Sequence, residues 1–290
     1  MKVYIEPTIP DFAILRIRDA LEKYVTKEHE IVKSEDEADL ILIYAFGQRR
    51  RMQHRANHIL AKGKKYAVMQ LCLRGTPNPN TKDWLPLWQK ANLVWSYYDL
   101  FELCQQDGTE FGFDFYHSPL GVDPEVFKEV SGEKKFIIAN TGNGKPWNKE
   151  CKNEVMLAAK ELGKPIFHIG IGETVEGEIV YSNGMDDRAL AEHYSQCDFV
   201  SGLRRQEGFE LPILEGLLCG ARPITFDKPH YRNWFGSLVE YIPEDHGMVT
   251  ENVAKLLKKD PRPVTEAEKE EVHHKFNWET IITEFWNRLS

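Results

Sequence analysis

Two glutamates eight positions apart, Glu207 and Glu215, flank the start of a predicted helix and are the most informative pair in the sequence. Pro212 suits the first turn of that helix, where a missing N–H costs no hydrogen bond. Gly220 suits the left-handed position just beyond its end. A short apolar run at residues 199–201 precedes the glutamates and predicts a buried strand. The helix therefore begins near the carboxyl end of a strand.

The first amides of this helix predict an anion site. The N–H groups of Glu210, Leu211 and Ile213 lack a partner inside the helix and lie at the positive end of its dipole. Such an end binds a diphosphate well. Glu215 lies one turn into the helix and Glu207 in the loop before it. Their carboxylates can therefore accept hydrogen bonds from hydroxyl groups on both sides of a bound diphosphate. A nucleotide-sugar, with hydroxyls on either side of a diphosphate, is such a ligand.

An amphipathic helix with ordinary surface glutamates is the alternative interpretation. It is favoured for either glutamate taken alone. For the complete arrangement it is weak, because burying a carboxylate beside a core helix is costly unless something binds it.

The run from Glu207 to Gly220 resembles the signature of the retaining GT-B glycosyltransferases (glycosyltransferase family 4-like). That family carries two glutamates eight positions apart in an EGFGLPxLEAxxCG-like run. Further resemblances follow in the family's order between Ser118 and Gly247: a hinge at 119–123 with Phe127, a strand and glycine-spaced turn at 165–172, and a helix ending in an aspartate at 187–198.

The resemblance implies a role for each matched residue. Glu215 would bind the ribose hydroxyls, and Glu207 would hold the hydroxyls of the transferred sugar. The amides of Phe209, Glu210 and Leu211 would bind the diphosphate. The remaining donor-binding candidates, of which the last three would flank the base, are Gly208, Gly142, Asn143, Ile169, Gly170 and Gly172.

Two lysines, Lys149 and Lys145, are the predicted stabilisers of the leaving diphosphate. The family carries an arginine and a lysine after the first strand of its second half; Lys149 matches the lysine, whereas Asn143 stands at the arginine position. Lys145 is a candidate substitute, with a solvated loop lysine as the equal alternative, and it offers a point charge instead of a two-pronged fork. Glu210 replaces the family's small residue, which is expected to affect sugar choice.

The mechanism implied by the resemblance is transfer with retention of anomeric configuration and without a protein nucleophile. The protein's contribution is then positioning and charge stabilisation. There is no Asp-x-Asp motif and no His/Cys cluster with ligand spacing, so we expect no metal. We expect no cofactor beyond the co-substrate, a UDP- or GDP-sugar.

The pattern around these residues predicts an α/β fold. Apolar runs alternate with amphipathic stretches, which is typical of parallel sheets covered by helices. Strands are predicted at 2–5, 29–32, 40–45, 67–73, 93–97, 115–120, 136–139, 165–169, 178–181, 199–201, 222–226 and 238–241. With the resemblance, this indicates the GT-B architecture: two Rossmann-like, doubly wound domains facing each other across a cleft. The expected parts are an acceptor-side domain at 1–122, a nucleotide-sugar-binding domain at 123–264, and a C-terminal helix at 265–290 that packs back on the first domain.

The first half carries an uneven charge. Residues 40–82 contain nine basic side chains and no acidic one, in a chain of net charge −8. This favours an anionic acceptor: a lipid phosphate or membrane surface, a glycan such as a polysaccharide precursor, or DNA with a modified base. A solvated helix face is at least as good an interpretation. The acceptor-side candidates are Arg49, Arg50, Arg51 and His117, although a histidine near a strand end is more often structural.

The cysteines and the apolar runs of the sequence bear on where the protein is located. Five scattered cysteines without a C-x-x-C pair, and the lack of any apolar run of about 18 residues, favour a cytoplasmic protein without a transmembrane segment, peripheral to a membrane if its acceptor is a lipid. The sequence also shows no apolar leader.

Two alternative functions remain open from the sequence. They are a sugar-nucleotide epimerase and a non-catalytic protein that binds nucleotide-sugars or nucleic acid.

Overall fold

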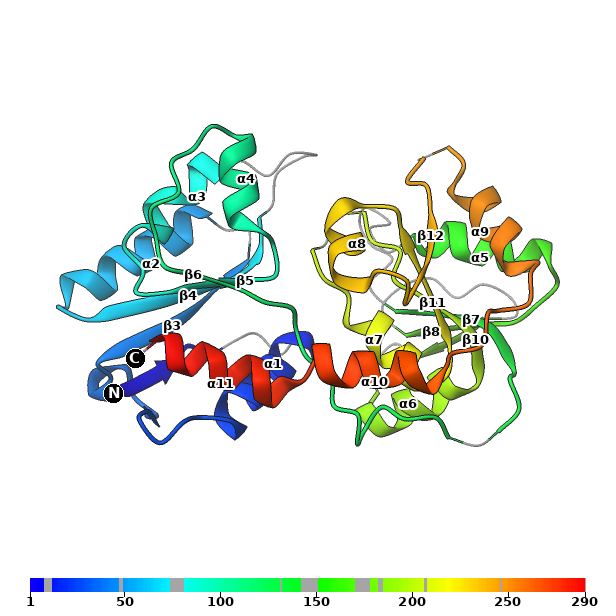
Figure 1. Ribbon diagram of the computed structural model, residues 1–290, viewed down its shortest axis with the longest axis horizontal. Helices are drawn as coiled ribbons and strands as arrows, with labels where there is room; N and C mark the ends of the chain where they lie inside the picture. The colour runs from blue at the N-terminus through cyan, green and yellow to red at the C-terminus, as the bar shows by residue number, and fades with distance from the viewer. Residues whose placement is uncertain are drawn as a thin grey trace. The chain divides into compact units, whose positions relative to one another are not determined.

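The chain forms two compact units in a computed structural model (Figure 1). The first comprises Met1–Gly121 and Trp278–Ser290, and the second comprises Val122–Asn277. The structure describes residues 1–7, 12–46, 49–73, 81–130, 132–141, 151–169, 178–181, 185–205, 208–245 and 247–289.

The first unit is built on a six-stranded parallel sheet in the order β2-β1-β3-β4-β5-β6. Its strands are β1 (Lys2–Ile5), β2 (Glu30–Ile31), β3 (Leu40–Phe46), β4 (Lys65–Cys72), β5 (Val94–Ser96) and β6 (Phe115–His117). The two central strands, β3 and β4, are buried at almost every position. Continuous apolar runs of this kind are expected where helices cover both faces of a parallel sheet.

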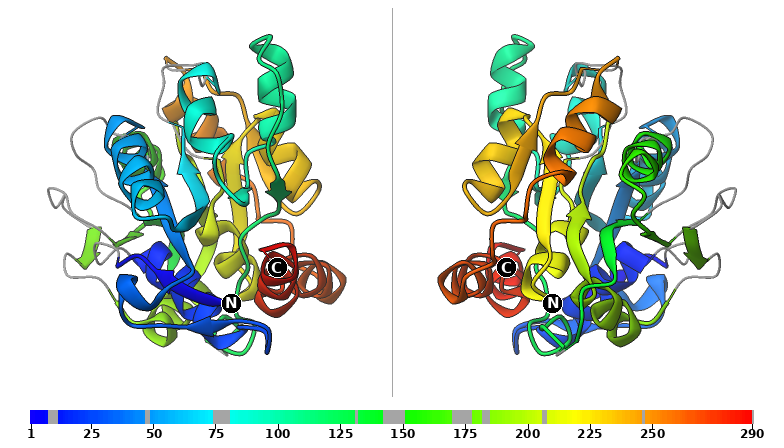
Figure 2. Two further views of the ribbon diagram at one scale, coloured as in Figure 1. Left: turned by 90° about the vertical axis from the view of Figure 1, so that its left-hand side faces the viewer. Right: turned by 90° about the vertical axis from the view of Figure 1, so that its right-hand side faces the viewer.

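Helices cover both faces of this sheet (Figures 1 and 2). They are α1 (Phe12–Lys23), the 3₁₀ turn η1 (Glu35–Glu37), α2 (Arg49–Ala61), α3 (Thr81–Trp88), α4 (Leu100–Gln106) and α11 (Trp278–Leu289). One core cluster joins α2, α3 and α4 to the sheet. Helices α1 and α11 pack together on the other face, where the indole N–H of Trp286 donates to the carbonyl of Leu21 (3.2 Å).

The second unit has a doubly wound parallel sheet in the order β12-β11-β10-β7-β8-β9. Its strands are β7 (Phe136–Thr141), β8 (Ile166–Ile169), β9 (Glu178–Tyr181), β10 (Cys197–Ser201), β11 (Arg222–Phe226) and β12 (Glu240–Ile242). The chain moves outward from β7 to β9, then returns to place β10 on the other side of β7. Ligands of such sheets bind beyond the carboxyl ends of the strands at this reversal, here between β7 and β10.

Six helices of the second unit lie in the described ranges: α5 (Lys152–Glu161), α6 (Asp187–Ser195), α7 (Leu211–Leu218), α8 (Pro229–Phe235), α9 (Val249–Leu257) and α10 (Glu266–Lys275). Helices α5 and α9 share one core cluster with the sheet. Helix α7 packs against β10 and β11, and α6 and α10 pack against α7. No helix among the described residues is both long and apolar enough to cross a membrane.

The C-terminal tail is divided between the units. Helix α10 lies in the second unit and α11 in the first, with a break at Phe276–Asn277 between them. The N–H of Val122 donates to the carbonyl of Phe276 (2.9 Å), so the outgoing and returning segments are hydrogen-bonded. Gly121 is required beside them, because a Cβ there would lie 2.5 Å from a ring carbon of Trp278.

Candidate functional site

Seven predicted site residues lie outside the described part of the chain: Glu207, Lys145, Lys149, Gly142, Asn143, Gly170 and Gly172. Their roles stay predictions. The described residues do establish where these segments start and end. Residues 142–150 follow β7, residues 170–177 follow β8, and residues 206–207 lie in the connection from β10 to α7.

Helix α7 begins after the carboxyl end of β10, as the sequence predicts. Glu210 is its N-cap residue, Pro212 lies in its first turn, and Gly220 adopts a φ of +80° past its end. One amide differs from expectation: the N–H of Ile213 donates to the carbonyl of Glu210 (3.2 Å) and is not open to an anion. The anion-binding prediction is therefore restricted to the amides before Pro212.

Two glycines allow α7 to lie close against β10. A Cβ on Gly216 would lie 2.3 Å from Cγ1 of Val200. A Cβ on Gly202 would lie 2.5 Å from Cγ1 of Ile213. Contacts this short cannot hold a side chain without a shift of helix or strand. The amino-terminal end of α7 is thereby fixed relative to the carboxyl end of β10.

Glu215 is buried on α7, with 2% of its surface exposed. Burial, together with the charge of Glu215, raises the pKa of the Cys219 thiol to about 12. A carboxylate in such surroundings is costly unless it is hydrogen-bonded. Its burial distinguishes Glu215 from an ordinary surface glutamate of an amphipathic helix.

Gly208, Phe209 and Leu211 surround the start of α7. The Phe209 ring packs against Phe235 (5.2 Å between centroids) and Phe276 (5.9 Å). Leu211 is also buried. Their side chains therefore belong to the core, and only their backbone amides suit the predicted contact with a diphosphate.

Arg204, in the connection after β10, is a candidate that the sequence analysis missed. It is only 5% exposed. Its Nη2 donates to the carbonyl and to the hydroxyl of Thr141 (3.0 Å to Oγ1), at the end of β7. Its Nε lies 3.3 Å from a carboxylate oxygen of Glu210. The buried guanidinium of Arg204, just after the end of β10, thus contacts both the end of β7 and the start of α7. The ends of β7 and β10 border the switch point.

The same connection is held from two further sides. Nζ of Lys228, the residue before α8, donates to the carbonyls of Arg204 (3.0 Å) and Arg205 (2.9 Å). The Arg205 guanidinium pairs with Glu154 on α5 and donates to the sulfur of Cys151 (3.1 Å). These ties fix the described part of the loop that leads to Glu207.

Asn140 and His168 are neighbours at the carboxyl ends of β7 and β8, and both are fully buried. Nδ2 of Asn140 lies 3.3 Å from Nδ1 of His168. Burial lowers the pKa of His168 to about 4, and the positive charges of Lys152 and Arg204 act in the same direction. His168 is therefore neutral near pH 7 and does not add to the positive charge at the switch point. Ile169, the predicted base contact, is the last residue of β8.

The acceptor-side candidates lie in the first unit. Arg49, Arg50 and Arg51 begin α2, which follows β3, while His117 ends β6. Strands β4 and β5 lie between them, so all four are on one edge of the sheet without forming one cluster. The His117 ring stacks on Phe115 (5.8 Å between centroids), and its Nε2 lies 3.4 Å from the carbonyl oxygen of Tyr97. Burial lowers the pKa of His117.

The basic segment is less positive in space than in sequence. Arg49 pairs with Asp83. Arg55 pairs with Glu6 and Glu35 (2.6 Å each), and Lys62 also pairs with Glu35 (3.2 Å). All three acidic partners lie outside residues 40–82. This compensation weakens the inference of an anionic acceptor. Arg50 and Arg51, at the start of α2, are exposed.

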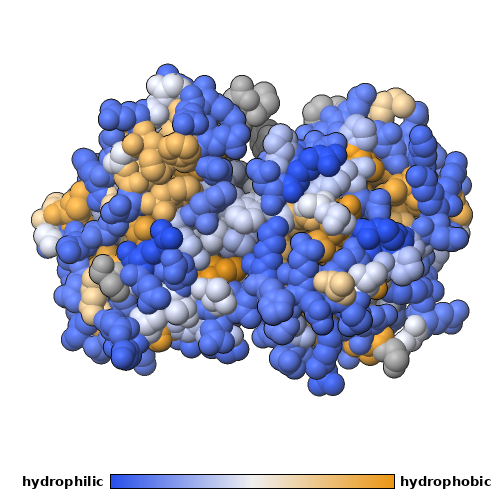
Figure 3. Space-filling model, in the orientation of Figure 1, coloured by the Kyte–Doolittle hydropathy of each residue, from blue (hydrophilic) through white to orange (hydrophobic). Residues whose placement is uncertain are grey.

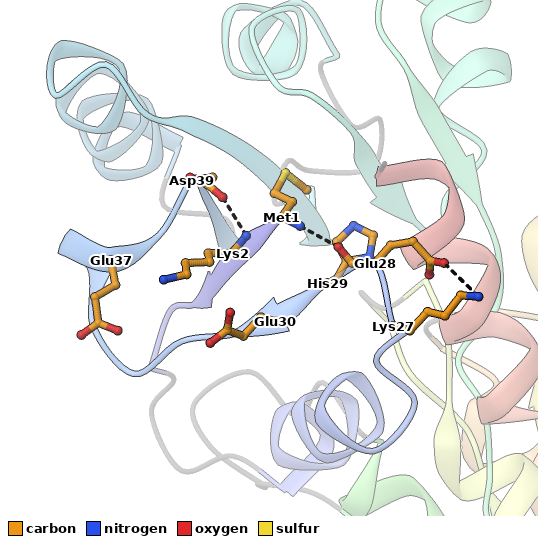
Figure 4. Close-up of a pocket in the computed structure, with 8 residues that line it drawn as sticks. All are labelled: Met1, Lys2, Lys27, Glu28, His29, Glu30, Glu37 and Asp39. Atoms are coloured by element: carbon orange, nitrogen blue, oxygen red, sulfur yellow. Dashed lines mark hydrogen bonds and ion pairs between the residues drawn. The ribbon is translucent and has the colours of Figure 1, made fainter.

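Two other surface features of the first unit are less suited to a catalytic or ligand-binding site than the switch point of the second unit. An apolar area is visible over α3 and α4 (Figure 3). On α4, the Phe101 side chain is 49% exposed. A charged depression at the amino-terminal edge of the sheet is lined by Met1, Lys2, Lys27, Glu28, His29, Glu30, Glu37 and Asp39 (Figure 4). The Met1 ammonium donates to the carbonyl of Glu28 (2.6 Å), the N–H of Lys2 donates to the carboxylate of Asp39 (2.8 Å), and Lys27 pairs with Glu28 (3.9 Å). Within the described ranges, no group of three or more His, Cys, Asp or Glu side chains is arranged to hold a metal.

No family model and no curated protein matches the sequence. Solved structures do match the fold. HepE of Anabaena, in complex with UDP and glucose, has a TM-score of 0.72 at 11% identity, over 99% of this chain and 98% of that one. Sucrose-phosphate synthase of Thermosynechococcus elongatus has a TM-score of 0.70 at 11% identity, over 99% and 97%. The pneumococcal O-GlcNAc transferase GtfA, in complex with UDP and GlcNAc, has a TM-score of 0.63 at 15% identity, over 94% of this chain and 59% of GtfA.

Identities this low establish architecture only. The match to HepE extends over 99% of this chain, so it includes both parallel-sheet units. The chain consists of two parallel-sheet, Rossmann-like α/β units and has the GT-B fold.

Proposed function

We propose that this protein is a glycosyltransferase that takes its sugar from a nucleotide-sugar bound at the β7/β10 switch point of the second unit. The observation that carries the proposal is the buried carboxylate of Glu215, placed on a helix whose amino-terminal end lies at that switch point. A diphosphate suits the helix end, and ribose hydroxyls suit the carboxylate behind it.

The donor we propose is a UDP-sugar. UDP is bound in the solved structures of HepE and GtfA, which share the fold. GDP-sugars are the second choice. In either case Gly208, Phe209 and Leu211 contribute backbone amides, and Ile169 lies at the strand end expected to border the base.

The reaction we propose is direct transfer with retention and without a metal. The departing diphosphate gains charge, which the amides before Pro212 and the predicted cations Lys149 and Lys145 would stabilise. Glu207 would orient the sugar, and the acceptor hydroxyl would attack on the face that the diphosphate leaves. Positioning and electrostatics then supply the rate enhancement without a covalent enzyme intermediate.

For the acceptor we propose an anionic molecule that approaches the edge of the first unit carrying Arg50, Arg51 and His117. Arg50 and Arg51 are exposed at the start of α2. Because these charges are few, we expect the acceptor's anionic group to contribute modestly to its affinity and to be screened by salt.

A thermal-shift panel of UDP, GDP, ADP, CDP and TDP and their sugar conjugates, with and without magnesium, tests this function. A ligand that binds only the native state raises the melting temperature. We expect UDP and its conjugates to give the largest shift, unchanged by magnesium. A requirement for magnesium would contradict the metal-free mechanism, and the absence of any shift would contradict the proposed function. Turnover of the conjugate without an acceptor to a second nucleotide-sugar would identify an epimerase instead.

A further inference from the structure

A buried ion pair occupies the start of α7. Nε of Arg204 lies 3.3 Å from a carboxylate oxygen of Glu210, and the two side chains are 7% and 5% exposed. The hydroxyl of Tyr231 lies 3.5 Å from the other oxygen of Glu210. Removing two charges from water is costly, so a buried pair is weak evidence for a contribution to stability. We therefore look for a role of the Arg204–Glu210 pair in ligand binding instead of in stability.

The carboxylate of Glu210 lies where the helix attracts an anion. An N-cap side chain normally accepts a hydrogen bond from the first turn of its helix. Glu210 is the N-cap of α7 but makes no such bond. Its carboxylate turns to Arg204 and Tyr231 instead. The amino-terminal end of α7 and the guanidinium thus share one internal negative charge.

Arg204 would keep its position without Glu210. Its Nη2 is bound to the carbonyl and hydroxyl of Thr141, and its own carbonyl accepts from Lys228 (3.0 Å). These anchors come from β7 and from the residue before α8. Neutralising Glu210 therefore changes the charge at the site more than it changes its geometry.

We propose that Arg204 supplies a cation to the diphosphate subsite and that Glu210 sets the subsite's charge so that it favours the nucleotide-sugar over the free nucleoside diphosphate. The inference rests on the proposed function. The diphosphate of a nucleotide-sugar is esterified at both ends, so it carries two negative charges. The terminal phosphate of a nucleoside diphosphate has a second ionisation near pH 6, so the product carries about one more negative charge at neutral pH. A fixed carboxylate repels this product more strongly than the donor, which assists product release.

Isothermal titration with UDP, UDP-glucose and inorganic pyrophosphate tests the proposal. We expect Glu210→Gln to tighten UDP binding about tenfold and UDP-glucose binding only about threefold, because one charge is removed near the diphosphate. Arg204→Met should weaken all three ligands by about tenfold or more. Glu240→Gln is the control: it makes the same change in net charge at a carboxylate paired with Arg262, on β12.

The outcomes separate this inference from the function on which it rests. If the wild type binds UDP but Glu210→Gln leaves the ratio of UDP to UDP-glucose affinity unchanged, or if Glu240→Gln shifts it equally, the proposed role of Glu210 is wrong and the function stands. If the wild type binds neither UDP nor pyrophosphate, both are wrong. Should Arg204→Met fail to fold, Arg204→Lys keeps the charge without the fork, and its UDP affinity should still fall several-fold.

Discussion

Replacing Glu215 by glutamine is expected to weaken the binding of both nucleoside diphosphate and nucleotide-sugar by about 100-fold. The carboxylate would accept hydrogen bonds from two ribose hydroxyls, and charge-assisted bonds are worth about 1.5–3 kcal/mol each. Glutamine has the same shape, so it fits the site where the glutamate is 2% exposed. Titration calorimetry measures the affinity, and circular dichroism with a thermal melt verifies the fold.

Glu207→Ala provides the matched comparison. This residue would hold the sugar and not the nucleotide, so its loss should reduce turnover severely, by about 100-fold, while the affinity for the free nucleoside diphosphate stays close to that of the wild type. A folded Glu215→Gln protein with wild-type affinity would remove Glu215 from the donor site. Equal losses of nucleoside diphosphate affinity in both variants would show that the two glutamates do not divide the donor between them.

Replacing Arg222 by methionine is expected to destabilise the protein by about 3 kcal/mol, because it removes the donor of three carbonyls and one of the two arginine partners of Glu268, the other being Arg262 (2.8 Å). Arg222 begins β11 and is fully buried. Its guanidinium binds both oxygens of Glu268 (2.9 and 3.0 Å). It also donates to the backbone carbonyls of Leu238, Arg262 and Pro263. Urea denaturation measures the loss, and Arg188→Met, at an exposed side chain of α6, is the control.

The same pair predicts a pH dependence. Burial opposes ionisation of Glu268, but hydrogen bonds from Arg222 and Thr265 outweigh it and lower the pKa of that carboxyl from 4.5 to about 2. The unfolded chain therefore binds this proton first as the pH falls, and the stabilisation is present above pH 4.5 and lost between 4.5 and 2. In Glu268→Gln, which is destabilised at neutral pH, this part of the acid sensitivity should be missing. An unchanged slope of unfolding free energy against pH would contradict the pairing.

Local features of the sequence predicted the fold well. Each of the twelve predicted strands corresponds to an observed one, because buried parallel strands are short apolar runs between turns. The start and end of α7 were predicted from Pro212 and Gly220, whose backbone preferences act within a few residues. The position of Glu215 one turn into the same helix was also predicted, while its role in binding stays a prediction.

Contacts between distant residues could not be predicted in this way. Arg204 binds Thr141, 63 residues earlier, and nothing near either residue indicates the pairing. The charge of the basic segment was overestimated for the same reason. Glu35 lies outside the segment but folds against Arg55 and Lys62. The net charge of a segment counted from the sequence equals the charge on the folded surface only when no acidic side chain from elsewhere in the chain pairs with that segment.

Hydrogen–deuterium exchange of the protein with and without UDP most directly tests whether a nucleotide binds at the switch point of the second unit. Bound diphosphate should slow exchange in peptides that cover residues 203–215, at the start of α7, and leave α2 of the first unit unchanged. Protection confined to the first unit, or no protection at saturating UDP, would contradict the proposed donor site.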